Sequence, residues 1–315
     1  MLGFFLQPGA TDQIRAMDID EQVKIHAIEV IENGYTVVRG TIPEDRCLST
    51  IDRFEQFAAL NADIFDRHRL EHGHYPRIVN LHAVFPDLLP LFTRNPVWLA
   101  VQDLLFGGPT ALYTSLFYEI GSQQPLHRDT PVFCTRPEYL YFGTTVYLEA
   151  AGDENGCLEV LKGGHRIPQL DREKMALRRY GNLDNIPPLD DDAWIEYQDT
   201  TVKLGRAMGM KTEKVYVGAG DSLIWHPQLP HGGSAIRDMN RTRFSFVMHT
   251  TPVGVPVYHQ QAFFNPNRPF PETAPWTYID RDGRKIVECS TVSFNHQSEY
   301  PAESFKTLED RLAYA

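Results

Sequence analysis

Long apolar runs, paired cysteines and an excess of basic residues are all missing from this chain of 315 residues. No stretch approaches the roughly 18 consecutive apolar residues that a membrane-spanning helix needs, so we expect no membrane span. The four cysteines are far apart and form no C-x-x-C pair, which argues against a disulfide scaffold or a thiolate zinc site. The first residues carry an apolar patch without a basic flank or a cleavage site, and we expect a cytoplasmic protein with reduced thiols.

Acidic residues outnumber basic ones by 41 to 30, which gives a formal net charge of −11. A nucleic-acid-binding surface needs a basic stripe that displaces counterions from phosphates, so we expect no nucleic-acid partner. A small-molecule substrate remains compatible with this charge, because one pocket can be basic on an acidic protein. The sequence leaves the oligomeric state open, a homodimer included.

The sequence changes character near residue 110, although we expect one domain over residues 1–315. Residues 18–108 form a mainly helical part, in which Asp20 caps a first helix that Gly34 ends. A short strand is expected over 35–39. Two more helices are expected, one from Pro43 to about Leu70 and one between Pro86 and Leu105, interrupted near Pro96.

Residues 110–250 contain short runs rich in Leu, Val, Thr and aromatic residues, separated by Gly, Pro or Asn. Such a pattern predicts an antiparallel sandwich or a small barrel. The runs expected as strands are 111–120, 126–133, 144–149, 158–161, 215–217, 222–225 and 243–250. An insertion over about 166–211 interrupts them and is either a lid over a site or a surface excursion. Residues 251–315 are expected to wrap the barrel.

The segment Leu126-His127-Arg128-Asp129 carries the strongest chemical signal. Successive side chains of a strand alternate between its faces, so His127 and Asp129 would point the same way as two metal ligands. His231, from a distant run and followed by small residues, is the third candidate ligand. Two histidines and one carboxylate on one face are the donor set of non-haem Fe(II) oxygenases.

A candidate anion-binding pair follows His231 at a distance of twelve residues. Arg243 and Ser245 would share one face of a strand, where a guanidinium holds a carboxylate through two hydrogen bonds and the hydroxyl adds a third. An ordinary surface ion pair is the alternative for the arginine. We expect His226 to lie beside the site or in the core and His165 to be structural. The histidines that either contact substrate or belong to surface loops are His72, His74 and His82.

Four stretches, in this order, carry a resemblance to a known family. They are GYTVVR at 34–39, QPLHRD at 124–129, ENGCLEVLKGGH at 154–165, and GDSLIWHPQLPHG at 220–232 with Arg243 after it. Together they resemble the phytanoyl-CoA dioxygenase (PhyH-like) family of Fe(II)/2-oxoglutarate-dependent oxygenases. The chain departs from the family pattern at Lys162-Gly-Gly-His165, where a P-G-S-H sequence is usual.

The resemblance implies a mainly β fold with flanking helices around a double-stranded β-helix, a jelly-roll or cupin-like core. It implies that His127, Asp129 and His231 bind iron(II), and that O2 and 2-oxoglutarate are co-substrates. Arg243 would pair with the distal carboxylate of 2-oxoglutarate, with Arg241 as the alternative on the same face. The resemblance also places Gln124 and Thr145 beside the co-substrate.

The resemblance further implies an enzyme, a dioxygenase that oxidises an unactivated C–H bond of a small or medium-sized metabolite in secondary-metabolite biosynthesis. Hydroxylation is the main expectation, with desaturation, cyclisation and epimerisation left open. Asp129 fills the position that is small in family halogenases, which predicts no halogenation. The alternatives are a cupin-like zinc isomerase or hydrolase and a catalytically silent binding protein. The aromatic residues expected near a partly apolar substrate are Tyr113, Phe117, Tyr118, Phe133, Tyr139, Tyr141 and Phe142.

Overall fold

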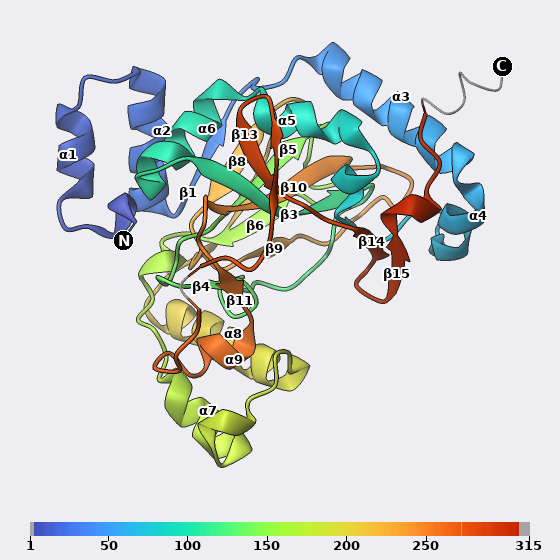
Figure 1. Ribbon diagram of the computed structural model, residues 1–315. Helices are drawn as coiled ribbons and strands as arrows, with labels where there is room; N and C mark the ends of the chain where they lie inside the picture. The colour runs from blue at the N-terminus through green and yellow to red at the C-terminus, as the bar shows by residue number, and fades with distance from the viewer. Residues whose placement is uncertain (1–2, 272, 309–315) are drawn as a thin grey trace.

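Two β-sheets of unequal size form the centre of the protein in a computed structural model that describes residues 3–271 and 273–308 (Figure 1). Within those residues, the large sheet has ten strands in the order β1-β8-β5-β10-β3-β2-β14-β15, and the hairpin β12–β13 joins it through β3. The small sheet has the order β7-β6-β9, and β4 pairs with β11. Neighbouring strands are antiparallel except β13 and β3.

The strands are β1 Tyr35–Val38, β2 Ile78–Val79, β3 Thr110–Tyr118, β4 Cys134–Thr135, β5 Phe142–Tyr147, β6 Leu158–Leu161, β7 Thr212–Val215, β8 Ser222–Trp225, β9 His231–Gly233, β10 Ser245–Pro252, β11 Val257–Tyr258, β12 Tyr278–Arg281, β13 Arg284–Val287, β14 Thr291–Phe294 and β15 Ser298–Pro301. The α-helices are α1 Ala10–Ala16, α2 Glu21–Asn33, α3 Glu44–Leu60, α4 Ala62–Phe65, α5 Leu89–Thr93, α6 Pro96–Phe106, α7 Arg172–Tyr180, α8 Asp191–Ala207 and α9 Gln260–Phe263. Short 3-10 turns lie at Phe4–Leu6, Asp66–His68, Leu81–Ala83, Pro86–Leu88, Gly164–Arg166, Leu183–Asn185 and Ala302–Ser304.

The two faces of the large sheet have different neighbours, as β10 illustrates. Phe246 and Met248 point into the main hydrophobic core, which they share with residues of α2, α3 and α6. Val247 and His249 alternate with them and face a cavity between the two sheets. Figure 1 shows α3, α5 and α6 on one side of the molecule and α7, α8 and α9 on the other. Helices α2, α3 and α6 therefore cover the outer face of the large sheet, and its inner face borders the cavity.

The expected first helix is confirmed as α2. The Asp20 carboxylate accepts hydrogen bonds from the backbone N–H groups of Gln22 and Val23, and Gly34 ends the helix in the left-handed conformation. The expectation of one helix from Pro43 to Leu70 is wrong, because α3 ends at Leu60. The Asn61 side-chain amide donates to the Phe57 carbonyl oxygen and the backbone turns away there.

Residues 126–133 do not form the expected strand. His127 makes a single bridge to His231, and Asp129 then begins a turn in which its carbonyl oxygen accepts from Val132 N and Phe133 N. Pro125 precedes this segment and Pro131 lies within it, and neither has an N–H group for a ladder, which explains why pairing stops. The expected strand at 243–250 is found as β10 from Ser245 onward.

The end of the chain completes the large sheet. β13 pairs with β3, and β14 lies between β2 and β15, so residues far beyond the expected barrel belong to its main sheet. The fold class predicted from the sequence, a mainly β jelly-roll core with flanking helices, is confirmed. In the described part of the chain no helix has the length and apolar character needed to cross a membrane.

Candidate functional site

His127, Asp129 and His231 meet in the interior, and one ligand atom of each lies within 4.8 Å of the others. His127 Nε2 is 3.3 Å from Asp129 Oδ1, and His231 Nε2 is 3.4 Å from Asp129 Oδ2. All three residues are buried. The structure therefore brings together the three side chains that the sequence pattern singled out, although they come from a bridge, a turn and the strand β9.

The two imidazoles are each fixed through the ring nitrogen that faces away from Asp129. His127 Nδ1 lies 2.8 Å from the Pro125 carbonyl oxygen, and His231 Nδ1 lies 3.0 Å from that of Leu229. A carbonyl oxygen only accepts, so each Nδ1 carries the proton and each Nε2 presents its lone pair to the centre. Burial lowers the pKa of His231 to about 4, so this imidazole is neutral near pH 7.

The Asp129 carboxylate is held by two side chains behind it. Its Oδ2 accepts from the Tyr141 hydroxyl at 2.7 Å and from Trp225 Nε1 at 3.1 Å. Burial by itself raises the pKa of Asp129, but the imidazoles of His231 and His127 outweigh it and hold the pKa well below its usual value. Ionised oxygen and neutral nitrogen donors are the forms that bind a divalent metal ion.

Gly143 makes room for the tryptophan that holds this carboxylate. Gly143 on β5 pairs with Trp225 on β8, and a Cβ at residue 143 would lie 2.0 Å from two atoms of the indole ring. Real Cβ atoms do not approach so closely, so any larger residue would displace the indole. The position of Trp225 Nε1 therefore depends on a glycine in the neighbouring strand.

The three residues lie in the wall of a cavity of about 800 Å³ between the two sheets. The large sheet contributes residues such as Leu116, Thr145 and Val247, and the small sheet contributes Leu158 and Gly232. The wall mixes apolar and polar side chains, as is usual for small-molecule sites. A metal ion held by the three residues would thus face a cavity large enough for small molecules.

Arg243 lines the same cavity and is only 5% exposed. Its Nη1 donates to the Gly156 carbonyl oxygen at 2.8 Å, whereas its Nε has no hydrogen-bond partner. The guanidinium carbon lies 5.7 Å from the Tyr147 ring, and no carboxylate in the described part of the chain pairs with it. Arg241, the alternative, is exposed. The buried cation that faces the cavity is therefore Arg243, which has room for an anion.

The other predicted co-substrate residues are placed differently from one another. Gln124 and Thr145 both line the cavity. Ser245 does not, although its hydroxyl is buried without a partner on the cavity side of β10. The expectation that Arg243 and Ser245 share one strand needs a correction, because Arg243 precedes β10 and its N–H donates to the Glu119 carbonyl oxygen.

The remaining histidines of the sequence analysis lie away from the three ligands. The His226 ring packs against Phe5 and His165, outside the cavity wall. His74 contacts Glu119 at 2.7 Å, and His82 contacts Ser115 at 2.7 Å. His72 is exposed. Among the aromatic residues, those that line the cavity are Tyr113, Tyr118 and Phe133, whereas Phe117, Tyr139, Tyr141 and Phe142 do not.

A family model of phytanoyl-CoA dioxygenase (PhyH) matches residues 30–243, about two thirds of the chain. The chain belongs to this family. The match contains all three candidate metal ligands and ends at Arg243. No curated protein matches the chain significantly.

Solved structures support the same fold. The α-ketoglutarate-dependent carbocyclase SnoK from nogalamycin biosynthesis superposes with a TM-score of 0.56 at 16% identity, over 82% of this chain and 93% of that one. The epimerase SnoN of the same biosynthesis gives 0.53 at 17% identity, over 85% and 98%. EctD from S. alaskensis gives 0.55 at 16% identity, over 85% and 88%.

Part of the cavity wall in this PhyH-family chain lies beyond the matched residues. His249, Trp276, Cys289 and His296 all line the cavity, and sequence reasoning did not select them as site residues. His249 is the nearest to the ligands, since its Nε2 is 3.9 Å from Asp129 Oδ2. Strand alternation from Val247 gives a signal for His249, but nothing local marks the other three residues.

The insertion at 166–211 forms α7 and α8 and packs onto the metal-ligand segment. The Gln198 side chain on α8 accepts from Arg128 N and donates to Arg128 O, both at 2.8 Å. The buried Arg128 guanidinium donates to the carbonyl oxygens of Gly164 and Ile167. Trp194 on α8 lines the cavity, and its ring lies 5.6 Å from that of His127. The insertion thus fixes the residue between the two ligands His127 and Asp129.

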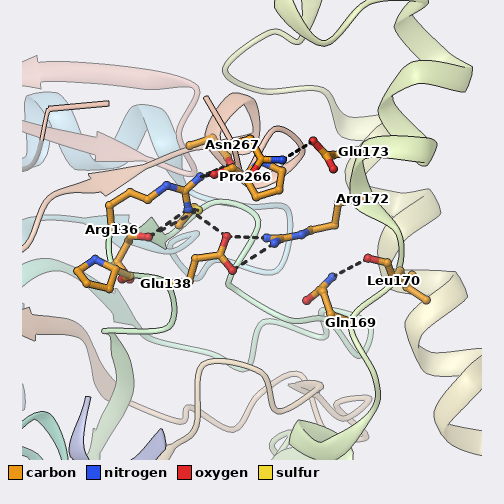
Figure 2. A network of polar contacts seen from close by, with 12 residues as sticks. Arg136, Glu138, Gln169, Leu170, Arg172, Glu173, Pro266 and Asn267 are labelled. Atoms are coloured by element: carbon orange, nitrogen blue, oxygen red, sulfur yellow. Dashed lines mark hydrogen bonds and ion pairs between the residues drawn. The ribbon is translucent and has the colours of Figure 1, made fainter. Parts of the chain in front are cut away.

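A second polar network joins α7 to the end of the chain. Figure 2 shows Glu138 between two arginines, with Arg136 and Arg172 each 3.0 Å from its carboxylate. Arg136 also donates to the Ala262 carbonyl oxygen at 2.7 Å, and Asn267 donates to Glu173 at 3.0 Å. The network therefore ties the insertion to the residues that follow the cavity-lining segment at 259–260.

Proposed function

We propose that this protein is a non-haem Fe(II)/2-oxoglutarate-dependent dioxygenase that oxidises an unactivated C–H bond of a small or medium-sized metabolite. The observation that carries the proposal is the meeting of two Nε2 atoms and one carboxylate in a cavity that also contains a buried, unpaired arginine. Membership of the PhyH family supports it.

The donor set fits an iron(II) ion. His127 and His231 offer neutral nitrogen atoms whose ring orientation is fixed by backbone carbonyl groups, and Asp129 offers an oxygen atom that Tyr141 and Trp225 orient. Three protein ligands on one side leave positions for other ligands, which is the pattern of non-haem iron oxygenases. Such supporting hydrogen bonds raise the affinity for the metal.

Arg243 fits the distal carboxylate of 2-oxoglutarate. A guanidinium with a free Nε in a buried place gains most from a bound carboxylate, because water competes little there. Thr145 and Gln124 lie on the cavity wall and are the polar groups we assign beside the co-substrate, while Ser245 would support the arginine end from β10.

Iron(II), 2-oxoglutarate and O2 together supply the oxidising power that breaks a C–H bond. The residues of this chain bind the reactants, orient them and keep water away. The cavity holds a small or medium-sized molecule, and its aromatic wall suits a partly apolar one. We assign hydroxylation as the main outcome, and secondary metabolism by analogy with SnoK and SnoN of nogalamycin biosynthesis.

The experiment combines a spectrum with a product assay. Anaerobic addition of Fe(II) and 2-oxoglutarate should give a visible charge-transfer band, and aerobic incubation should release succinate. Arg243→Met should raise the concentration of 2-oxoglutarate needed by about 10- to 100-fold, the value of a lost charged hydrogen bond. Arg241→Met is the matched control, since Arg241 is exposed two residues away.

Two results would overturn the proposal. Tight zinc binding without the band would indicate an isomerase or hydrolase of other chemistry. A band without succinate release, unchanged by His127→Ala, would indicate a binding protein.

A further inference from the structure

The inner face of the large sheet forms the floor of the cavity, and its side chains are arranged in rows that run across the strands. The row at the metal ligands contains His249 and Trp225. The row farthest from it contains Tyr118 and Tyr147, which flank Ser245. The two rows are four residue steps apart along β10, from Ser245 to His249, or about 13 Å at roughly 3.3 Å per residue. The cavity therefore extends well away from the ligand cluster.

Arg77 lies at the side of this distant row. It directly precedes β2, and the register of β2 with β3 places it opposite Tyr118. Its Nε is buried without a hydrogen-bond partner, and the residue lines the cavity. Burial raises the pKa of Tyr118, and the neighbouring Arg77 charge opposes that rise. The guanidinium of Arg77 is therefore close to the phenol and accessible from the cavity.

The turn after β14 brings a histidine to Arg77. Asn295 N donates to the Arg77 carbonyl oxygen at 2.9 Å, and both Asn295 and His296 have positive φ, at 52° and 58°. Gln297 N donates to the Phe294 carbonyl oxygen at 3.0 Å, so Asn295 and His296 are the central residues of a type I′ hairpin turn between β14 and β15. Burial and the Arg77 charge lower the pKa of His296 to about 4, so Arg77 rather than His296 carries the positive charge on this side of Tyr118.

Arg77 has no counter-ion in the described residues. The acidic residues of the cavity wall are Asp129, which belongs to the ligand cluster, and Asp191, which is exposed at the start of α8. Asn80 directly follows β2 and also lines the cavity. Its Oδ1 accepts hydrogen bonds from Thr114 and Ser115, which leaves the amide NH2 free to donate. A guanidinium that has no counter-ion and faces a cavity is a site for an oxyanion.

We propose that Arg77, with His296 beside it, binds a carboxylate of the substrate, which is therefore an organic acid with an apolar part reaching toward the metal ligands. This assignment of the bound acid as the substrate rests on the proposed function. Arg77 and Arg243 have separate tasks, since Tyr118 stands between them with the Arg243 guanidinium carbon 6.0 Å from its ring. The apolar side chains between the two ends include Val79, Leu116 and Val247.

Binding can be measured without turnover, because three of the four tryptophans, Trp194, Trp225 and Trp276, line the cavity. The probes are phenylacetate, phenylpropionate and phenylbutyrate, each compared with its uncharged amide. We expect the tightest acid of the series to quench tryptophan fluorescence with a dissociation constant about 10- to 100-fold lower than its amide, as a charged hydrogen bond provides.

The variants separate the two arginines. Arg77→Met should abolish the preference for acid over amide, Arg77→Lys should retain part of it because the charge remains, and Arg243→Met should retain it. Absence of quenching by every acid, equal binding of acid and amide, a preference that survives Arg77→Met, or a preference lost only in Arg243→Met would each overturn the proposal. Arg77→Lys keeps the test valid if Arg77→Met fails to fold.

The two proposals fail in different experiments. Acid binding at Arg77 without succinate release would contradict the oxygenase while leaving the anion site in place. Succinate release without an acid preference that depends on Arg77 would contradict only the assignment of the substrate class.

Discussion

The backbones of His127 and His231 exchange both of their hydrogen bonds, with N···O distances of 2.8 and 3.0 Å. The two residues lie 104 positions apart in the sequence, yet they form a directly opposed pair whose rings are 4.7 Å apart. In such a pair the side chains leave the backbone on the same side. The relative position of two candidate ligands is therefore set by main-chain geometry before any metal binds.

We expect added metal to stabilise the protein through this pair. A ligand at 100 times its dissociation constant adds about 2.7 kcal/mol to the free energy of unfolding. Manganese(II), which is stable in air, should raise the unfolding temperature of the wild type, and His127→Ala and His231→Ala should remove the rise. His72→Ala, at an exposed histidine, is the control and should keep it. An unchanged rise in both ligand variants would contradict the assignment.

Gly143→Ala should weaken metal binding without touching a ligand. The added Cβ displaces Trp225, so Asp129 loses one of its two supporting hydrogen bonds. Loss of such a partner costs about 10- to 100-fold in metal affinity, and overpacking costs about 1–3 kcal/mol of stability. Metal titration and urea unfolding measure the two effects. Gly152→Ala is the control, because a Cβ there meets open space; equal effects of both substitutions would refute the explanation.

Arg128→Met should loosen the insertion. The substitution leaves the buried Ile167 carbonyl oxygen without this donor, at a cost of about 1–3 kcal/mol, whereas the Gly164 carbonyl oxygen still accepts from Ile167 N. We expect faster hydrogen exchange and faster proteolysis over residues 166–211. Arg178→Met is the control, since Arg178 is an exposed residue of α7 whose ion pair with Glu196 contributes little. Identical exchange in the two variants would show that Arg128 does not hold the insertion.

Stability should fall as the pH is lowered from about 6.5 to 4. Burial lowers the pKa of His82 to about 4, so the unfolded chain takes up a proton in this interval and the folded protein does not. Its contribution is complete above the unfolded pKa and is lost as the pH approaches the folded one, with a slope of at most about 1.4 kcal/mol per pH unit. Urea unfolding of the metal-free protein measures this slope.

His82→Gln should make the pH slope shallower, since glutamine takes up no proton. His165 and His296, whose pKa values burial also lowers to about 4, keep part of the dependence in that variant. A slope that does not change would mean that His82 titrates alike in both states.

The sequence could predict the elements whose signals are local. Asp20 and Gly34 mark both ends of α2, and the short β-branched runs mark β1, β5, β6 and β8. Strand alternation predicts that His127 and Asp129 point the same way, although no strand forms there. The two side chains still point toward each other, because a bridge at His127 and a turn at Asp129 orient them toward the same place.

Other features depend on long-range pairing that periodicity does not reveal. Asp282-Gly283, a dipeptide typical of tight hairpin turns, joins β12 to β13, a hairpin that lies outside the predicted strands. The approach of His296 to Arg77 follows from the place of β14 in the sheet. Gly143 is informative only once Trp225 is known to lie across it.

The metal ligands and part of the cavity wall come from separate parts of the chain. His127, Asp129 and His231 all precede β10, whereas Trp276, Cys289 and His296 line the cavity from the part of the chain that follows it. A library randomised at those last three positions would therefore change the shape of the cavity while the three metal-binding residues stay unchanged. These positions are a natural starting point for directed evolution of the protein toward new small molecules.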